Sequence, residues 1–195
     1  VGSEMCIRDS NTPLATIKLQ AQLARRADEA GRQAALDDLD AGIERAIHLA
    51  AQLLALARLE PDQRQPAFEP VALDLLVRQE LAALSPLAEQ RQVDLGLEHA
   101  DALTLHGDRA ALLAMFDNLV DNALRYTGTG ARVDVSVTRD GNQAVLTVAD
   151  DGPGIAPADR ARATERFVRL QPSGAPGSGL GLAIARETAQ LHGGT

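Results

Sequence analysis

Apolar residues in the first part of the chain recur at the spacing of a helix. A first helix is predicted from Pro13, a residue that suits a first helical turn, and a second from a break near Gly31 to about Glu60. The second helix carries two interleaved apolar series with a seven-residue repeat, Leu36, Ile43, Ala50 and Ala57, and Leu39, Ala46 and Leu53. An antiparallel hairpin of two such helices cannot bury its seam alone. We therefore expect residues 11–60 to form a four-helix bundle with a second copy.

The pattern changes after a segment that contains three prolines, Pro61, Pro66 and Pro70. Proline at this density disfavours both helix and central strand, so residues 61–70 are predicted to be a linker. The second domain is predicted to span residues 71–195.

Helical and strand periods alternate in this second domain. Three helices are predicted, over residues 74–92 with Asp74 as the cap, over 109–126 and over 180–192. Three strands are predicted, over residues 93–105, 132–138 and 144–149, the last two joined by a turn at 140–142. The order of the elements indicates a domain of mixed α/β type.

Charge and composition remove several functional classes. The formal net charge is -8 and Lys18 is the single lysine, which argues against a nucleic-acid-coating protein and leaves no Walker A lysine. A protein-kinase fold, which needs a strand lysine, is disfavoured for the same reason. One cysteine, Cys6, cannot build a disulfide framework. No apolar run is long enough to span a bilayer, and the N-terminus lacks the order of a signal peptide.

The string NLVDNALRY, from Asn118 to Tyr126, places two carboxamides on one helical face, because Asn118 and Asn122 are four residues apart. An amide oxygen can complete the octahedron of a Mg²⁺ ion that phosphates already hold. Arg125, on the same side, could reach a phosphate as a cation. Taken alone, the same spacing also fits a surface helix with two solvated amides.

The string DDGPGI begins at Asp150, directly after a predicted strand. A carboxylate at a strand end can accept a hydrogen bond from the exocyclic amine of adenine, and Gly152 and Gly154 let the backbone approach the ring. An ordinary acidic turn has the same composition, so this string alone decides nothing.

The string GSGLGLAIA, from Gly177 to Ala185, follows a segment rich in glycine, proline and serine. Gly177, Gly179 and Gly181 suit a lid over phosphates, and a helix that begins near Leu180 would offer free N–H groups to phosphate oxygens. A disordered connector is the alternative interpretation.

The order and spacing of the three strings resemble the N, G1 and G2 boxes of bacterial sensor histidine kinases, within the superfamily of gyrase-like and chaperone-like ATPases. This resemblance implies that Asn122 is the Mg²⁺ ligand and that Asn118 occupies the position of a polar catalytic residue. It further implies that Arg125 contacts phosphate, that Tyr126 lies beside the nucleotide and that Asp150 reads adenine. ATP and Mg²⁺ are the implied ligands, and Gly152, Gly154, Gly177, Gly179, Leu180 and Gly181 complete the implied pocket.

The resemblance covers nearly all of residues 11–195 and implies an architecture. A helical hairpin is expected to precede an α/β sandwich of the histidine-kinase ATPase type, a mixed sheet with helices on one face. The tripeptide Glu165-Arg166-Phe167 resembles the short F box before the lid. The chain ends where this family continues, so we expect the last strands of the domain to be missing.

Residues 12–24 resemble the downstream half of the H box, the helix that carries the phosphoacceptor histidine. That histidine lies four residues before the threonine, and here Arg8 occupies the position, followed by Asp9. Either the chain is a degenerate kinase, or residues 1–10 are an unstructured, non-authentic leader joined to a fragment. We favour the leader.

The implied parent protein binds ATP–Mg²⁺, moves the γ-phosphoryl group to a histidine and then to the receiver domain of a response regulator. It is expected to be a homodimer and the cytoplasmic portion of a bacterial inner-membrane protein, with membrane segments only upstream. The alternatives are a pseudokinase that dimerises and binds ATP, and a response-regulator phosphatase that uses Thr12. A gyrase-like ATPase does not account for the hairpin, and a purely structural helical dimer does not account for the pocket strings.

Overall fold

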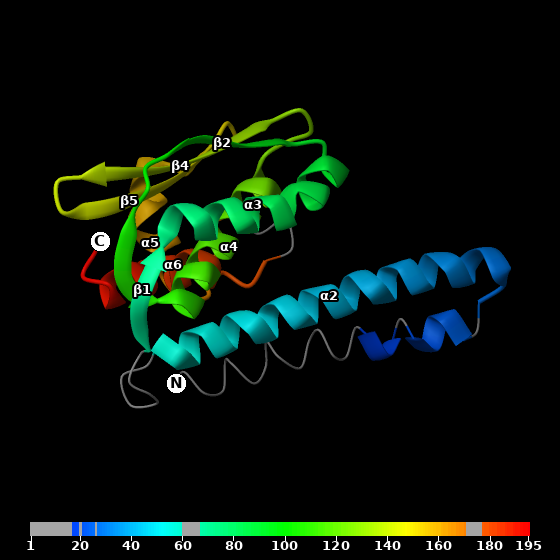
Figure 1. The fold of residues 1–195 in the computed structure, drawn as a ribbon. Helices are drawn as coiled ribbons and strands as arrows, with labels where there is room; N and C mark the ends of the chain where they lie inside the picture. The colour runs from blue at the N-terminus through cyan, green and yellow to red at the C-terminus, as the bar shows by residue number, and fades with distance from the viewer. Residues whose placement is uncertain (1–16, 20, 26, 60–66, 171–176) are drawn as a thin grey trace. The chain divides into compact units, whose positions relative to one another are not determined.

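The computed structural model describes residues 17–19, 21–25, 27–59, 67–170 and 177–195 (Figure 1). The chain divides into two compact units, residues 1–54 and 55–195, and each is described by itself. The predictions for Arg8, for Thr12 and for the leader at residues 1–10 lie outside the described residues.

The first unit is helical, as predicted. Residues 17–19 and 21–25 are helical, and helix α2 spans Glu29–Leu59. The helices are separated earlier than predicted, at residues 27 and 28, because the Asp28 carboxylate accepts a hydrogen bond of 3.0 Å from the Gly31 N–H and caps the first turn of α2. Gly31 therefore lies inside α2 and does not break it.

The second unit contains the remaining elements (Figure 1). In chain order they are β1 (Phe68–Ala72), α3 (Leu73–Gln90), β2 (Asp94–Ala100), β3 (Thr104–Asp108), α4 (Arg109–Tyr126), β4 (Arg132–Asp140), β5 (Gln143–Asp150), the 3₁₀ helix η1 (Pro157–Asp159), α5 (Arg160–Ala163) and α6 (Gly181–Leu191). The predicted helix over residues 109–126 is confirmed, as is the β4–β5 hairpin, whose turn contains Gly141 at φ +57°.

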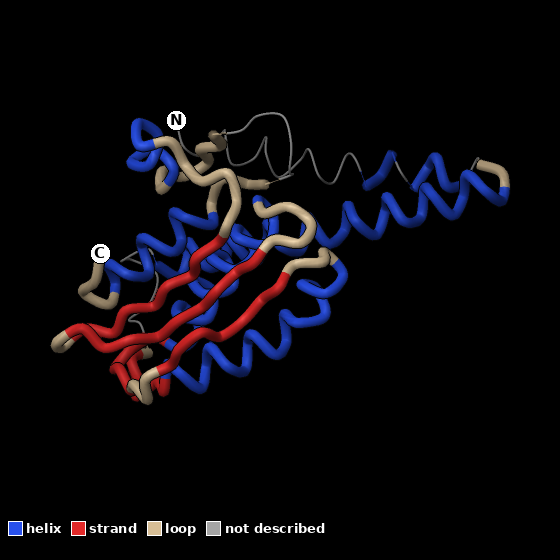
Figure 2. Tube along the Cα trace, turned by 90° about the horizontal axis from the view of Figure 1, so that it is seen from above, coloured by secondary structure: helices blue, strands red, loops and turns tan. Residues whose placement is uncertain are grey.

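Three strands form a mixed sheet in the order β2-β4-β5, with β2 parallel to β4 and β4 antiparallel to β5. Helices of the second unit cover one face of this sheet (Figure 2). Val133, Val135 and Val137 alternate along β4 and are fully buried, as are Val77 of α3 and Phe116 of α4. The predicted mixed sheet with helices on one face is confirmed.

The predicted linker is wrong at its C-terminal end. Phe68–Pro70 belong to β1, which pairs antiparallel with β3 from Phe68 opposite Asp108 to Ala72 opposite Thr104. Pro70 is tolerated because the pair β1-β3 has only two strands, so β1 has a free edge. The strand runs directly into α3, whose N-cap is Ala72, so Asp74 lies in the first turn and is not the cap.

The single strand predicted over residues 93–105 is two strands. β2 pairs with β4, whereas β3 pairs with β1, and Asp101 ends the first pairing. Its backbone N–H donates to Val137 O, and its carboxylate accepts from the Arg139 N–H at 2.8 Å, so the chain turns away after residue 100. The hydrogen bond from the His99 side chain, followed by that from the Arg139 N–H, holds the pKa of the Asp101 carboxyl below its usual value.

His192 fastens the end of α6 to the β1-β3 pair. Its Nδ1 donates to Thr188 O at 2.8 Å, so Nε2 is the acceptor for the Asp108 N–H at 3.0 Å. The ring stacks on Phe68 at 5.1 Å with an interplanar angle of 5°. His192 ends the helix, as predicted, and also joins three elements that are distant in sequence.

Candidate functional site

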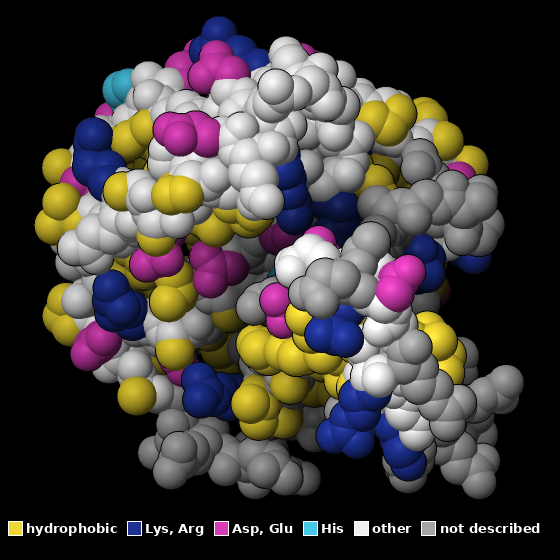
Figure 3. Space-filling model, turned by 90° about the vertical axis from the view of Figure 1, so that its right-hand side faces the viewer, with side chains coloured by type: hydrophobic (Ala, Val, Ile, Leu, Met, Phe, Trp, Pro, Cys, Tyr) yellow, Lys and Arg dark blue, Asp and Glu magenta, His cyan; other side chains and the backbone are white. Residues whose placement is uncertain are grey.

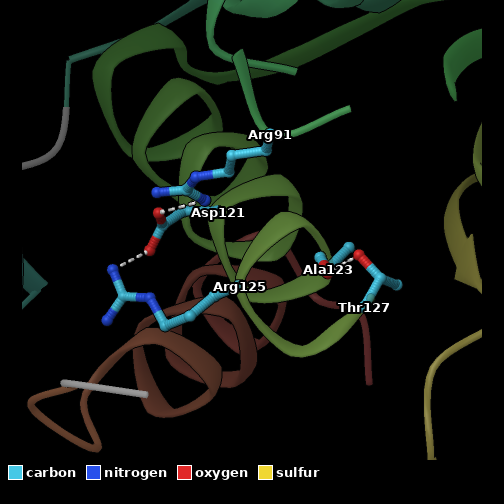
Figure 4. Close-up of polar contacts among 5 residues, drawn as sticks. All are labelled: Arg91, Asp121, Ala123, Arg125 and Thr127. Carbon is cyan, nitrogen blue, oxygen red and sulfur yellow. Dashed lines mark hydrogen bonds and ion pairs between the residues drawn. The ribbon is translucent and has the colours of Figure 1, made fainter. Parts of the chain in front are cut away.

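The N-box helix α4 is fixed at both ends by side-chain hydrogen bonds. Asp108 caps its N-terminus by accepting from the Ala110 and Ala111 N–H groups at 2.9 and 3.0 Å. At the C-terminus, Thr127 Oγ1 donates to Ala123 O at 2.9 Å (Figure 4). The last turns of α4, which carry the predicted site residues, are therefore held rigidly.

Asn118 is buried in α4, and its side chain faces the start of α6. Its Nδ2 donates to Ala114 O at 2.7 Å. A Cβ added at Gly181 would lie 3.1 Å from Asn118 Oδ1. The structure therefore brings the first asparagine of the N box against the last glycine of the G2 box. Asn122 lies one turn further along α4 and is half-buried.

Arg125 and Tyr126 lie next to the first glycine of the G2 box. A Cβ added at Gly177 would lie 3.2 Å from Arg125 Nη1 and 3.6 Å from the Tyr126 hydroxyl. Arg125 Nη2 forms an ion pair with the carboxylate of Asp121 at 2.5 Å. Arg125 and Tyr126, the residues predicted to contact the nucleotide, thus lie beside Gly177, in the described part of the lid.

Asp150 is the last residue of β5, and its carboxylate closes a tight turn by accepting from the Gly152 N–H at 3.0 Å. A Cβ at Gly152 would approach Asp150 Oδ1 to 2.7 Å and Tyr126 O to 3.1 Å, so a side chain there would displace the Asp150 carboxylate and crowd the Tyr126 carbonyl. The G1 turn therefore packs directly against the end of the N-box helix.

The two ends of the lid are joined. The Phe167 N–H donates to Gly179 O at 2.9 Å, and a Cβ at Gly179, where φ is +71°, would meet Val168 O at 2.7 Å. Arg166 adds a bidentate contact to the Glu187 carboxylate of α6, with distances of 2.9 and 2.8 Å. The F-box arginine thus clamps the start of the lid to the helix that follows it.

Leu180 lies at the start of the helix that follows the lid, where it was predicted to complete the pocket. Its side chain is completely buried, and its backbone N–H donates to Ser178 Oγ at 3.2 Å. The helix begins one residue later than predicted, with Leu180 as the N-cap. The N–H groups that this helix would offer to phosphate are therefore those of the residues after Leu180, and the role of Leu180 in the pocket stays a prediction.

Three charged residues at the site were not predicted. Asp121 lies between Arg125 and Arg91, whose Nη1 is 3.9 Å from Asp121 Oδ1 (Figure 4). Burial, followed by the nearby carboxylates of Glu80 and Asp121, raises the pKa of Asp117 to about 6. The spacing of Asp121 and Arg125 signals their pairing in the sequence, whereas Arg91 comes from the end of α3 and gives no such signal.

Residues 107–195, from β3 to the end of the chain, match the family of histidine kinase-, DNA gyrase B- and HSP90-like ATPases. The matched range contains all three pocket strings. The second unit is therefore an ATP-binding domain of this class. Among the described residues, no helix is both long and apolar enough to cross a membrane.

Comparison with similar proteins identifies the family within this class of ATPases. The sensor protein kinase PmrB of Pseudomonas aeruginosa is 38% identical over 183 residues, which cover 93% of this chain and 38% of PmrB. The solved structure of the mycobacterial sensor histidine kinase MprB is 32% identical, with a TM-score of 0.57, and the match covers 65% of this chain and 81% of that chain. The chain belongs to the sensor histidine kinases, a family of ATP-dependent phosphotransferases.

One further structure shows the likeness of the fold over almost the whole chain. Histidine kinase ThkA in complex with the response regulator protein TrrA has a TM-score of 0.74 at 18% identity, and the match covers 98% of this chain and 55% of that chain. The chain spans about two fifths of the length of the curated relatives that it matches.

Proposed function

We propose that the second unit binds ATP–Mg²⁺ at the C-terminal end of α4. The observation that carries the proposal is the convergence of the three pocket strings on that end of the helix. Gly152 packs on Tyr126 O, Gly177 faces Arg125 and Tyr126, and Gly181 faces Asn118. Segments that are far apart in sequence thus border one place.

The residues at this place fit the parts of ATP. Asp150 offers a carboxylate to the adenine amine beside a turn that a Cβ would fill, and Arg125 offers a cation to phosphate. Among the described residues, no group of three or more His, Cys, Asp and Glu side chains could hold a metal. Mg²⁺ would be held by phosphate oxygens together with the Asn122 amide oxygen.

We propose the phosphorelay of the family as the activity of the whole protein. ATP supplies the γ-phosphoryl group, which passes to a histidine and then to a response regulator, the class of partner named for ThkA. Arg125 would orient the phosphates and Asn118 would fix the start of the lid helix, so this chain's own contribution is positioning and charge neutralisation. Membrane attachment would come from segments upstream of the hairpin.

Charge supports a protein partner over nucleic acid. The formal net charge is -8, and on the face shown in Figure 3 the basic side chains are spread among acidic and hydrophobic ones. A protein that neutralises nucleic-acid phosphates presents a continuous basic patch instead.

We propose that the hairpin forms a homodimer. Large apolar side chains remain exposed along both helices, with Leu19 at 57%, Leu23 at 54%, Ile47 at 58% and Leu54 at 62%. A second copy would bury these side chains in a four-helix bundle.

The position of Arg8 leads to a separate proposal, that the chain as printed binds ATP without phosphorylating itself on histidine. An arginine cannot accept a phosphoryl group as an imidazole does. Incubation with γ-labelled ATP should leave no acid-labile, alkali-stable label, and Arg8→His should restore it. A label of that kind on the unaltered chain would refute the proposal, as would an unlabelled Arg8→His variant that still binds ATP.

The binding proposal is tested by calorimetry with ATP and adenosine, with and without Mg²⁺. Asp150→Asn should weaken ATP and adenosine alike by tenfold or more, because roughly 1.5–3 kcal/mol is lost with a charged hydrogen bond. Asn122→Ala should remove the gain in ATP affinity that Mg²⁺ provides and leave adenosine unchanged. Asn142→Ala, the same change in the exposed β4–β5 turn, is the control. Unchanged ATP affinity in both site variants would overturn the proposal.

A further inference from the structure

Asp121 is the one acidic residue of the N-box string, and both of its carboxylate oxygens face arginine. Oδ2 contacts Arg125 Nη2 at 2.5 Å, and Oδ1 lies 3.9 Å from Arg91 Nη1 (Figure 4). Arg125 is on the same helix one turn later, whereas Arg91 is the C-cap residue of α3. The carboxylate is therefore anchored between two helices.

The guanidinium of Arg125 has two ends with different surroundings. Nη2 is occupied by Asp121, while Nη1 points to the lid, where a Cβ at Gly177 would lie 3.2 Å away. Because a guanidinium is planar and rigid, fixing one terminal nitrogen fixes the direction of the other. Asp121 thus determines which way the second nitrogen of Arg125 points.

We infer that Asp121 is a positioning residue for nucleotide phosphates, which holds the Arg125 guanidinium so that Nη1 faces the phosphates under Gly177. The inference rests on the proposed function, in which Arg125 contacts phosphate. Asp121 itself touches no phosphate and acts through Arg125.

Alternatively, the Asp121 carboxylate could compete with phosphate for Arg125, because a negative charge beside a phosphate site lowers the affinity of that site for phosphate. Two features favour positioning. The charge of Asp121 is shared with two arginines, so little negative field remains toward the lid. Arg125 is largely buried, at 21% side-chain exposure, so its orientation is worth more than that of a solvated arginine.

The experiment compares the affinities of ATP and adenosine in the chain and its variants, by calorimetry for ATP and by NMR titration for adenosine. Asp121→Asn keeps the size of the side chain and removes its charge. It should weaken ATP by about fivefold, the scale of a partly exposed charged contact, and leave adenosine within twofold. A merely structural defect would weaken both ligands together. Asp140→Asn, the same change at the exposed end of β4, is the matched control and should alter neither affinity.

Arg125→Gln and the double variant test the phosphate contact of Arg125 and the positioning role of Asp121 separately. Arg125→Gln should weaken ATP by about tenfold relative to adenosine, and Asp121→Asn added to it should weaken ATP no further. If Arg125→Gln leaves ATP unchanged, the proposed phosphate contact fails. If Arg125→Gln weakens ATP but Asp121→Asn does not, or tightens it, only the role of Asp121 is overturned.

Discussion

The helical hairpin and the ATP-binding domain bury their apolar residues in opposite ways. In the domain, Phe116, Val120 and Val135 have no exposed surface. In the hairpin, Ile47 and Leu54 remain more than half exposed, although they lie on one regular helix. The domain therefore closes its own core, whereas the hairpin presents an apolar stripe that another chain can cover.

Polar contacts in the two regions include local and long-range ones. In α2, Gln33 donates to Asp37, one turn away, at 2.9 Å. In the domain, polar contacts also join distant segments, as when His192 accepts from the Asp108 N–H and Arg166 pairs with Glu187. Contacts between segments this far apart form only in the folded domain. A site built from three separate strings depends on the fold in the same way.

The largest effect should follow from opening the core of the domain. Phe116→Ala removes a fully buried ring and should lower the free energy of unfolding of this unit by about 3–5 kcal/mol. Tyr126 is the only tyrosine and the chain has no tryptophan, so its fluorescence in a urea titration reports this unit. Phe68→Ala, at a position 37% exposed, is the control and should cost less. Equal losses would contradict the conclusion that the buried core around Phe116 holds this domain together.

A smaller effect, confined to association, is expected from the hairpin. Ile47→Asp places a charge on the exposed stripe and should raise the dimer dissociation constant by about a hundredfold, because a charge is costly to bury without a partner. Sedimentation equilibrium measures this directly, while ATP affinity should stay the same. Ala41→Asp, at an exposed position of the same helix that is not one of its exposed large apolar residues, is the control. If both variants dimerise like the parent chain, the stripe is not the dimer interface.

The elements that the sequence predicted well are those with a local pattern. Residues 109–126 show a helical period and follow a good cap, and the β4–β5 hairpin has alternation on both sides of a turn. Strand β1 was missed because Pro70 suggests a linker, and its pairing with β3 depends on residues more than thirty positions away. Local sequence cannot reveal such a partner.

The site follows the same rule. The placement of Asn118, Asn122 and Arg125 on one side of a helix could be predicted from their four- and seven-residue spacing, whereas their roles stay predictions. The complete burial of Leu180 at the N-cap of α6 could not be predicted, because it depends on packing within the folded domain. Arg91 was missed because its approach to Asp121 is made by the turn after α3.

The smallest expected effect concerns Asp117, whose pKa burial raises to about 6 from 3.8, with Glu80 and Asp121 adding to the shift. A carboxyl with a raised pKa favours the fold while it is protonated, and this contribution is lost as pH rises from about 4 through about 6. Asp117→Asn should therefore stabilise the domain by about 1 kcal/mol at pH 7.5, a figure reduced for partial exposure, and by almost nothing near pH 4. Urea titrations at the two pH values measure the difference. Asp38→Asn, at an exposed position of α2, removes the same charge and should give no gain at either pH, because solvent already stabilises that carboxylate. A gain of equal size in both variants would mean that the net charge of the chain, and not the burial of Asp117, sets the pH dependence of the domain.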